Sequence, residues 1–122
     1  DIILVLVIIG MFVYPRWNLR RNAKLVEEAE FARLMPTSQL IDIREAKDFR
    51  IKHILGARNL PAGQIDQSLN ALSKHKPVLI YENGRPVGGA KVAKKLKKAG
   101  IPEVYILKSG LNSWNGKTKS GI

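Results

Sequence analysis

Residues 78–100 read VLIYENGRPVGGAKVAKKLKKAG, and the class of fold follows from this segment. Its first four residues form an apolar run that is too short for a helix and is typical of a buried strand. Residues 89–99 carry apolar side chains at helical spacing, with Gly100 at the position of a C-terminal cap and Pro102 soon after it. A strand, a glycine-bearing loop and a helix in this order predict an α/β unit.

Three further short apolar runs resemble the first, and helical patterns lie between them. The runs cover residues 40–43, 57–60 and 104–107, and the helical patterns cover residues 19–35 and 65–72. A polar, charged turn is expected after residue 43. Strands that alternate with helices predict a mainly parallel sheet flanked by helices on both faces.

The composition predicts one folded domain with a short appendage. The chain has 122 residues, of which 45% are hydrophobic and 25% are charged, which is close to the average for globular proteins. It carries a formal net charge of +11 and contains no cysteine. The absence of cysteine excludes disulfides, thiolate metal sites and a cysteine nucleophile within these residues.

The N-terminal segment has the pattern of a membrane anchor. Residues 2–14 are apolar apart from Gly10, and the basic residues Arg16, Arg20, Arg21 and Lys24 follow them. A full span needs about 20 apolar residues, so we read residues 1–17 as part of a transmembrane helix. A signal peptide would carry its charge before the apolar run, and a buried core helix is the other alternative. The basic residues after the span predict a single-pass protein of the cell membrane with its folded domain in the cytoplasm.

We therefore divide the chain into four segments. They are the partial anchor over residues 1–17, a basic helical linker over 18–26, the folded domain over 27–116 and a C-terminal tail over 117–122.

The loop after the strand at 78–81 is the first place to look for a ligand site. In open parallel sheets, ligands bind outside the carboxyl ends of the strands, and a helix N-terminus presents backbone N–H groups to anions. An ordinary connecting loop is the alternative. The candidate loop consists of Glu82, Asn83, Gly84, Arg85, Pro86, Val87 and Gly88.

Several motifs together resemble the rhodanese-homology family. They are LIDIRE at 40–45 with Phe49, HILGARNLP at 53–61, VLIY at 78–81, and VYILKSGLNSW at 104–114. The resemblance runs from about residue 27 to residue 116. It implies a rhodanese-like α/β domain whose active members carry a persulfide on a loop cysteine and pass its sulfur to a nucleophile.

The chain departs from the family pattern at the site itself. Sulfur-transferring members have a cysteine directly after the strand tyrosine and usually an arginine five residues later, and these positions are Glu82 and Val87 here. Arg85 replaces the lost arginine only if the loop is rearranged, and Pro86 removes one backbone N–H. A carboxylate cannot form a persulfide, so the resemblance predicts no catalytic residue.

A carboxylate at position 82 would nevertheless suit a ring of backbone amides. Helix N-termini stabilise negative charge by roughly 0.3–1 kcal/mol. We expect the Glu82 side chain to occupy the anion cradle of its own loop, and the alternative is a glutamate that points into solvent.

Other residues of the motifs are assigned structural roles. The resemblance implies that Asp42 and Arg44 brace loops by hydrogen bonds. We favour this role over catalysis, because a carboxylate beside a guanidinium is held ionised and is a poor proton shuttle. His53, in the stretch that contains Gly56, is expected to stabilise a turn, and Trp114 to cap the core. No metal site and no cofactor are expected.

The function predicted from the sequence is a membrane-anchored, catalytically inactive binding or regulatory module, with a sulfurtransferase-like enzyme of displaced chemistry as the alternative. Its partners would be membrane lipid and a protein or small anion. Nucleic acid is not expected, since no recognition motif accompanies the lysines. The lysines of the last helix form either a solvated face or a lipid contact, and they are Lys91, Lys94, Lys95, Lys97 and Lys98.

Overall fold

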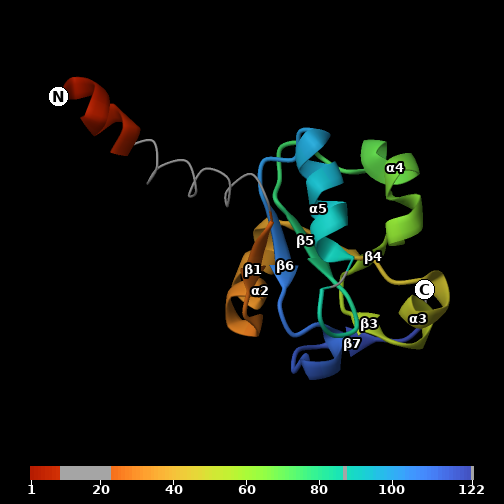
Figure 1. Ribbon diagram of the computed structural model, residues 1–122. Helices are drawn as coiled ribbons and strands as arrows, with labels where there is room; N and C mark the ends of the chain where they lie inside the picture. The colour runs from red at the N-terminus through yellow and green to blue at the C-terminus, as the bar shows by residue number, and fades with distance from the viewer. Residues whose placement is uncertain (9–22, 87, 122) are drawn as a thin grey trace.

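A five-stranded parallel sheet forms the centre of the molecule (Figure 1). The computed structural model describes residues 1–8, 23–86 and 88–121. Across the sheet, the strands lie in the order β1 (Lys24–Val26), β6 (Val104–Leu107), β5 (Val78–Tyr81), β2 (Gln39–Asp42) and β4 (Arg58–Asn59). Every neighbouring pair is parallel. The mainly parallel sheet predicted from the sequence is therefore confirmed, and each of the four predicted runs contributes a strand.

The central strand β5 alternates its side chains between two cores. Val78 and Ile80 lie in one buried cluster, and Leu79 and Tyr81 lie in the other. All four are fully buried. A strand that is covered on both faces has no polar face, which explains why the run at 78–81 is uniformly apolar.

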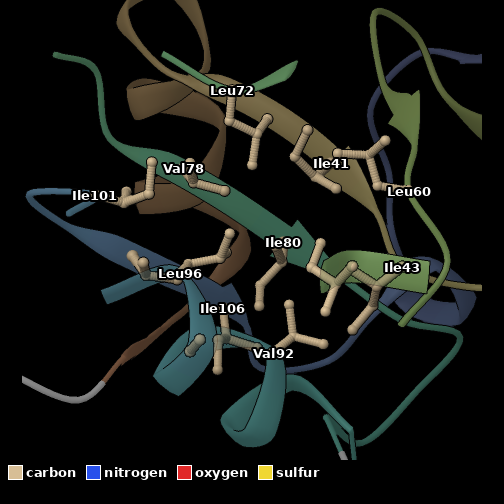
Figure 2. Close-up of a cluster of buried hydrophobic side chains, with 13 residues drawn as sticks. Ile41, Ile43, Leu60, Leu72, Val78, Ile80, Val92, Leu96, Ile101 and Ile106 are labelled. Carbon is tan, nitrogen blue, oxygen red and sulfur yellow. The ribbon is translucent and has the colours of Figure 1, made fainter. Parts of the chain in front are cut away.

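The first core lies under two helices, α4 (Ile65–Ser68) and α5 (Gly89–Lys98). Figure 2 shows Val92 and Leu96 of α5 among the side chains of this core. From α5, Val92, Ala93 and Leu96 point into this core, and the lysines lie outside it. The helix ends as predicted, because Gly100 has φ +103 and its N–H donates to the Lys97 carbonyl. The helix predicted over 65–72 is a shorter α4 that continues as a 3-10 helix over Leu69–Ala71.

The second core lies on the opposite face. It joins Phe31 of α2 (Glu28–Leu34) to Leu79, Leu107 and Leu111. Its rim includes Trp114, whose ring meets that of Phe31 edge-on at 5.9 Å. Trp114 therefore packs at the edge of this core.

A second, small sheet differs from the sequence prediction. It pairs β3 (His53–Ile54) with β7 (Thr118–Lys119) in antiparallel register. The segment over 117–122, predicted as a tail, thus supplies a strand. The turn predicted after residue 43 contains the helix α3 (Ala46–Ile51), which buries Phe49.

The prediction of one helix over 19–35, and with it a helical linker over 18–26, was wrong at residues 24–26. These residues form β1, which pairs with β6, and the helix α2 begins only at Glu28. The strand exists because Val26 is buried against the sheet and its carbonyl accepts the Lys108 N–H at 2.9 Å. Such tertiary pairing overrides local helix propensity.

Of the predicted anchor over residues 1–17, the described part is a helix over residues 2–8 with exposed side chains. Residues 9–17 lie outside the described residues. Within the described ranges, every helix is too short or too polar to cross a bilayer.

Candidate ligand-binding loop

The candidate loop lies at the end of the sheet where the parallel strands finish, which we call the carboxyl end. It follows β5 at Tyr81 and leads into α5 at Gly89. Strand β2 finishes beside β5, because Asp42 is paired with Tyr81 in the register of the two strands. Side chains that follow β2 and β5 therefore meet at this end. The loop is described except for Val87.

The Glu82 side chain turns back onto the start of α5. Its Oε1 accepts the Gly88 N–H and its Oε2 accepts the Gly89 N–H, each at 3.0 Å. These are amides at a helix N-terminus, where the helix dipole favours a negative charge. The prediction that Glu82 occupies the amide cradle of its own loop is confirmed.

Glycine at positions 88 and 89 allows this close approach. A Cβ at Gly88 would lie 3.2 Å from Oε1 of Glu82, and one at Gly89 would lie 3.3 Å from Oε2. Both distances are shorter than ordinary van der Waals contact. The two glycines therefore leave room for a group that sits directly on the backbone.

A second loop holds the first one from the side. The Leu111 N–H donates to the Glu82 carbonyl and the Asn112 N–H donates to the Asn83 carbonyl, both at 2.8 Å. Between the loops, Gly110 has φ +71, and a Cβ there would lie 2.5 Å from the Gly84 carbonyl oxygen. No side chain fits at that position, so the approach of the two loops requires glycine.

Asp42 and Arg44 form a buried ion pair below the loop. The Asp42 side chain is fully buried and 7% of the Arg44 side chain is exposed. Arg44 Nη2 lies 2.6 Å from Asp42 Oδ2, and Arg44 Nε lies 3.0 Å from Oδ1. The Asp42 carboxylate also accepts the Arg44 backbone N–H at 2.9 Å.

Arg44 extends this pair into a brace between three segments. Its Nη1 donates to Asn83 Oδ1 at 2.8 Å, and its Nη2 donates to the Lys52 carbonyl at 2.6 Å. Burial lowers the pKa of Arg44, but the hydrogen bonds and negative charge of Asp42 outweigh burial and raise it overall. The guanidinium is therefore permanently charged, and Arg44 links Asp42 to Asn83 after β5 and to Lys52 after α3.

Tyr81 anchors the end of β5 beneath the loop. Its hydroxyl accepts the Ile54 N–H at 3.0 Å, and the Arg44 guanidinium carbon lies 5.8 Å from its ring centre. Burial, followed by interaction with the Asp42 carboxylate, raises the pKa of the Tyr81 hydroxyl. Tyr81 is thus a neutral structural group rather than a proton donor to a ligand.

His53 lies below the surface, where its ring contacts the end of α3. Its ring stacks on that of Phe49 at 3.7 Å between centres, and its Nδ1 lies 2.8 Å from the Phe49 carbonyl oxygen. The chain then turns at Gly56, which has φ +91. The contacts of the His53 side chain thus join β3 to the last turn of α3.

An open cavity of about 540 Å³ lies beside the loop. Four predicted loop residues line it together with Arg44, and they are Glu82, Asn83, Gly84 and Arg85. Pro86, Gly88, His53, Gly56 and Trp114 are not among its lining residues. The prediction missed a wall that consists of Lys47 and Asp48 of α3 and of Glu45, which directly precedes this helix. The signal for that wall was the polar, charged segment after residue 43, which was predicted as a turn.

The cavity carries charges of both signs and no nucleophile of the thiol class. Arg85 and Lys47 contribute positive charge, and Glu45 and Asp48 contribute negative charge. Within the described residues, no group of three potential metal ligands comes together. The arrangement can bind a polar ligand with charges of both signs, and its amide cradle is filled by a side chain of the chain itself.

Comparison with known proteins points to one family. The sequence pattern of the rhodanese-like domain matches residues 27–117. Over 116 residues, the chain is 38% identical to the uncharacterized protein YqhL of Bacillus subtilis. The aligned region covers 95% of this chain and 88% of that protein. It is 29% identical over 106 residues to the thiosulfate sulfurtransferase GlpE of Tolumonas auensis, covering 85% of this chain and 91% of that protein. The crystal structure of the Alr3790 protein from Anabaena matches with a TM-score of 0.68 and 26% identity, over 80% of this chain and 93% of that one.

Proposed function

This chain belongs to the rhodanese-like domain family, and from that membership and the geometry of the loop we propose that it is a non-catalytic binding module. One observation carries the proposal, namely that the Glu82 carboxylate fills the amide cradle at the start of α5. The sulfur-transferring members that the sequence resembles place their cysteine at this position. A carboxylate cannot attack sulfur and hold it as a persulfide, and the chain contains no cysteine that could do so.

The ligand of such a module would bind in the open cavity rather than in the cradle. A small anion has no free amides to bind at Gly88 and Gly89, because Glu82 accepts both of them. The cavity beside them offers charges of both signs from α3 and from the loop. This lining suits a segment of a partner protein that carries both acidic and basic side chains.

The experiment that tests the absence of catalysis is sulfur transfer from thiosulfate to cyanide. In the family mechanism, a thiolate attacks the outer sulfur of thiosulfate and releases sulfite, and cyanide then removes that sulfur as thiocyanate. The purified chain is compared with Glu82→Cys and with Glu82→Ser, a matched variant that differs from the first in one atom. We expect thiocyanate above background only from Glu82→Cys, since its thiolate would lie on the two glycine amides. Turnover by the unaltered chain would overturn the proposal.

A second candidate function is a sulfurtransferase whose chemistry has moved to other residues. It is favoured by the similarity to the thiosulfate sulfurtransferase GlpE of Tolumonas auensis. The same assay decides between the two, because displaced chemistry predicts turnover that survives in Glu82→Ser. Background rates in both the unaltered chain and Glu82→Ser would reject this candidate.

We further propose that the module is attached to a membrane and faces the cytoplasm. The apolar run over residues 2–14 and the basic residues after it support attachment with the domain on the inner side. The described side chains of this run, from Ile2 to Ile8, are 46–79% exposed and thus available to lipid.

Membrane attachment is tested by washing membranes from cells that express the chain with alkaline carbonate. We expect the chain to stay in the pellet and the variant Val5→Asp/Ile8→Asp to be released, since each aspartate costs roughly 2.5–3.5 kcal/mol in a bilayer. The unaltered chain in the wash would contradict attachment. Cleavage of the domain by protease added outside intact cells would contradict the cytoplasmic orientation.

A further inference from the structure

The end of the sheet opposite the loop, where the parallel strands begin, is built from three segments that lie close together. Strand β1 begins there at Lys24, beside the start of β6. The loop before β5 is held there by Gln39, whose side chain accepts the Ser73 N–H at 2.8 Å and donates to the Lys76 carbonyl at 3.2 Å. The end of α5 also lies there, because a Cβ at Gly100 would be 3.6 Å from Cδ of Lys74.

These three segments carry five lysines, which we call the basic end. Four of them are exposed and Lys97 is half-buried with its Nζ on the Pro102 carbonyl at 2.7 Å. Lys95 is not counted, since its Nζ lies 3.0 Å from Oδ2 of Asp66 on α4. The five members are Lys24, Lys74, Lys76, Lys97 and Lys98.

Few carboxylates offset this charge. Among the described residues near the basic end, Glu103 accepts a hydrogen bond from the Tyr105 hydroxyl and Glu30 pairs with Arg33. With the Lys95–Asp66 pair set aside, two carboxylates therefore stand against five lysines and two arginines, namely Arg33 and Arg58, which begins β4. The carboxyl end differs, since the cavity there mixes Arg85 and Lys47 with acidic side chains. The end where β1 begins thus carries an excess of positive charge.

The same end receives the chain from the apolar N-terminal segment, because β1 is the first element of the domain along the sequence. In Figure 1, the start of β1 and the end of α5 lie at the top, and the small sheet of β3 and β7 lies at the bottom. Helix α5 has ten residues between the loop and the basic end, which corresponds to about 15 Å at 1.5 Å per residue. That length exceeds the screening length of about 8 Å at physiological salt.

We propose that the basic end is a docking surface for an anionic lipid bilayer, which orients the domain with its cavity away from the membrane. The inference rests on the proposed membrane attachment and adds to it the orientation of the domain. Lysines within a screening length of anionic headgroups are attracted to them, and charges at the carboxyl end lie beyond that length. The cavity beside Glu82 would then face the cytoplasm, where a partner protein can reach it.

Lipid is a better fit than nucleic acid to these particular lysines. Single-stranded nucleic acid is bound by basic grooves with aromatic side chains on which bases stack. Among the described residues of the basic end, the aromatic side chain is Tyr105, whose hydroxyl donates to Glu103. Flexible exposed lysines around a strand end instead suit a flat surface with diffuse negative charge.

The absence of cysteine allows one label to be placed at a time on the full chain. Thr37→Cys puts a fluorophore at the basic end, just before β2, and Ser113→Cys puts one at the carboxyl end, beside the loop that contacts Glu82. Both sites are exposed. The labelled chain is reconstituted into vesicles of phosphatidylcholine alone or with phosphatidylglycerol, each with a quencher on a lipid headgroup.

We expect the label at position 37, and not the label at 113, to be quenched when phosphatidylglycerol is present. The variant Lys74→Gln/Lys76→Gln/Lys98→Gln should lose this quenching. Each lysine contributes roughly fivefold to attraction by an anionic surface, so the docking equilibrium should fall on the order of a hundredfold.

A matched control removes the same net charge from the opposite end. The variant Lys52→Gln/Lys117→Gln/Lys119→Gln changes three exposed lysines near the small sheet, and it should keep the quenching of the label at 37. Equal quenching of both labels, or equal loss in the two triple variants, would overturn the proposal. A single-stranded oligonucleotide, added at the same phosphate concentration as the lipid, should not relieve the quenching at position 37. If it does, the surface binds nucleic acid and the proposal is overturned as well.

The vesicles of phosphatidylcholine alone, which have no net charge, distinguish failure of this inference from failure of the membrane attachment on which it rests. A chain that binds neutral vesicles but shows no preferred label on anionic ones would refute the orientation and leave attachment in place. A chain that does not bind neutral vesicles, yet is quenched at position 37 on anionic ones, would refute attachment and support docking by the basic end.

Discussion

Replacing Asp42 with alanine should destabilise the domain far more than removing an exposed carboxylate. The Asp42 carboxylate accepts four hydrogen bonds from Arg44, one from its backbone N–H and three from its guanidinium, at 2.6–3.1 Å. The Asp42 side chain is fully buried and that of Arg44 is 7% exposed. Asp42→Ala leaves this guanidinium buried without its partner, which costs about 3–5 kcal/mol.

The measurement is urea unfolding of the full chain, followed by tryptophan fluorescence. The midpoint should fall while the dependence on urea concentration stays unchanged, because the folded core is the same in both proteins. The matched control is Asp66→Ala, which breaks the exposed pair with Lys95, where the Asp66 side chain is 70% exposed. Such pairs contribute at most about 1 kcal/mol.

A double variant tests the reason for the loss. Asp42→Ala/Arg44→Met removes the uncompensated charge and should regain at least about 1 kcal/mol over Asp42→Ala alone, because replacing both members of a buried pair costs less than removing one. If Asp42→Ala and Asp66→Ala agree within about 0.5 kcal/mol, or if the double variant is the less stable one, the buried pair is not the brace described above.

Three further predictions concern single positions. Gly110→Ala should cost more than about 2 kcal/mol of unfolding free energy, because φ is +71 and a Cβ would lie 2.5 Å from a carbonyl oxygen. The control Gly63→Ala should change stability little, since a Cβ there meets nothing within 4 Å. Equal effects of the two variants would contradict the close approach of the loops. In Glu82→Gln, the side-chain NH2 would face one of the two backbone N–H groups that the carboxylate accepts in the unaltered chain, which should cost about 1–2 kcal/mol of unfolding free energy. Hydrogen exchange at the two glycine amides should quicken on the order of tenfold. Unchanged exchange would refute the cradle. A hydrogen bond to a neighbouring glutamate, with burial, raises the pKa of Tyr105 from 10.0 to about 12. The folded state therefore binds more protons than the unfolded state, and stability is lost as pH rises from 10 towards 12. In urea unfolding, Tyr105→Phe should lose less stability over this pH range, and an unchanged dependence of stability on pH would contradict the prediction.

The elements predicted best are those whose pattern is local. The run at 78–81 became β5 and the run at 104–107 became β6, with the bounds predicted. Helix α5 ends before Gly100, where the glycine was expected to cap it. These elements carry their own signal, because a strand buried on both faces needs an apolar run and a helix needs a defined stop.

The elements that were missed depend on partners far along the chain. Strand β1 has three residues and forms against β6, about eighty residues later. Strands β3 and β7 join His53 to Lys119 across most of the domain. Short segments of this kind have no periodicity long enough to be recognised, and their backbone hydrogen bonds are satisfied only after the chain has folded.

The site divides in the same way between chemistry and geometry. The sequence by itself determined that no thiol is present, that Glu82 follows the strand tyrosine, and that Asp42 and Arg44 stand at a strand end. Only the tertiary structure decided that Asn83 completes the brace through Arg44 and that α3 forms a wall of the cavity. The reason is physical: residue types set which bonds are chemically possible, whereas the packing of strands and helices sets which distant groups come within bonding distance.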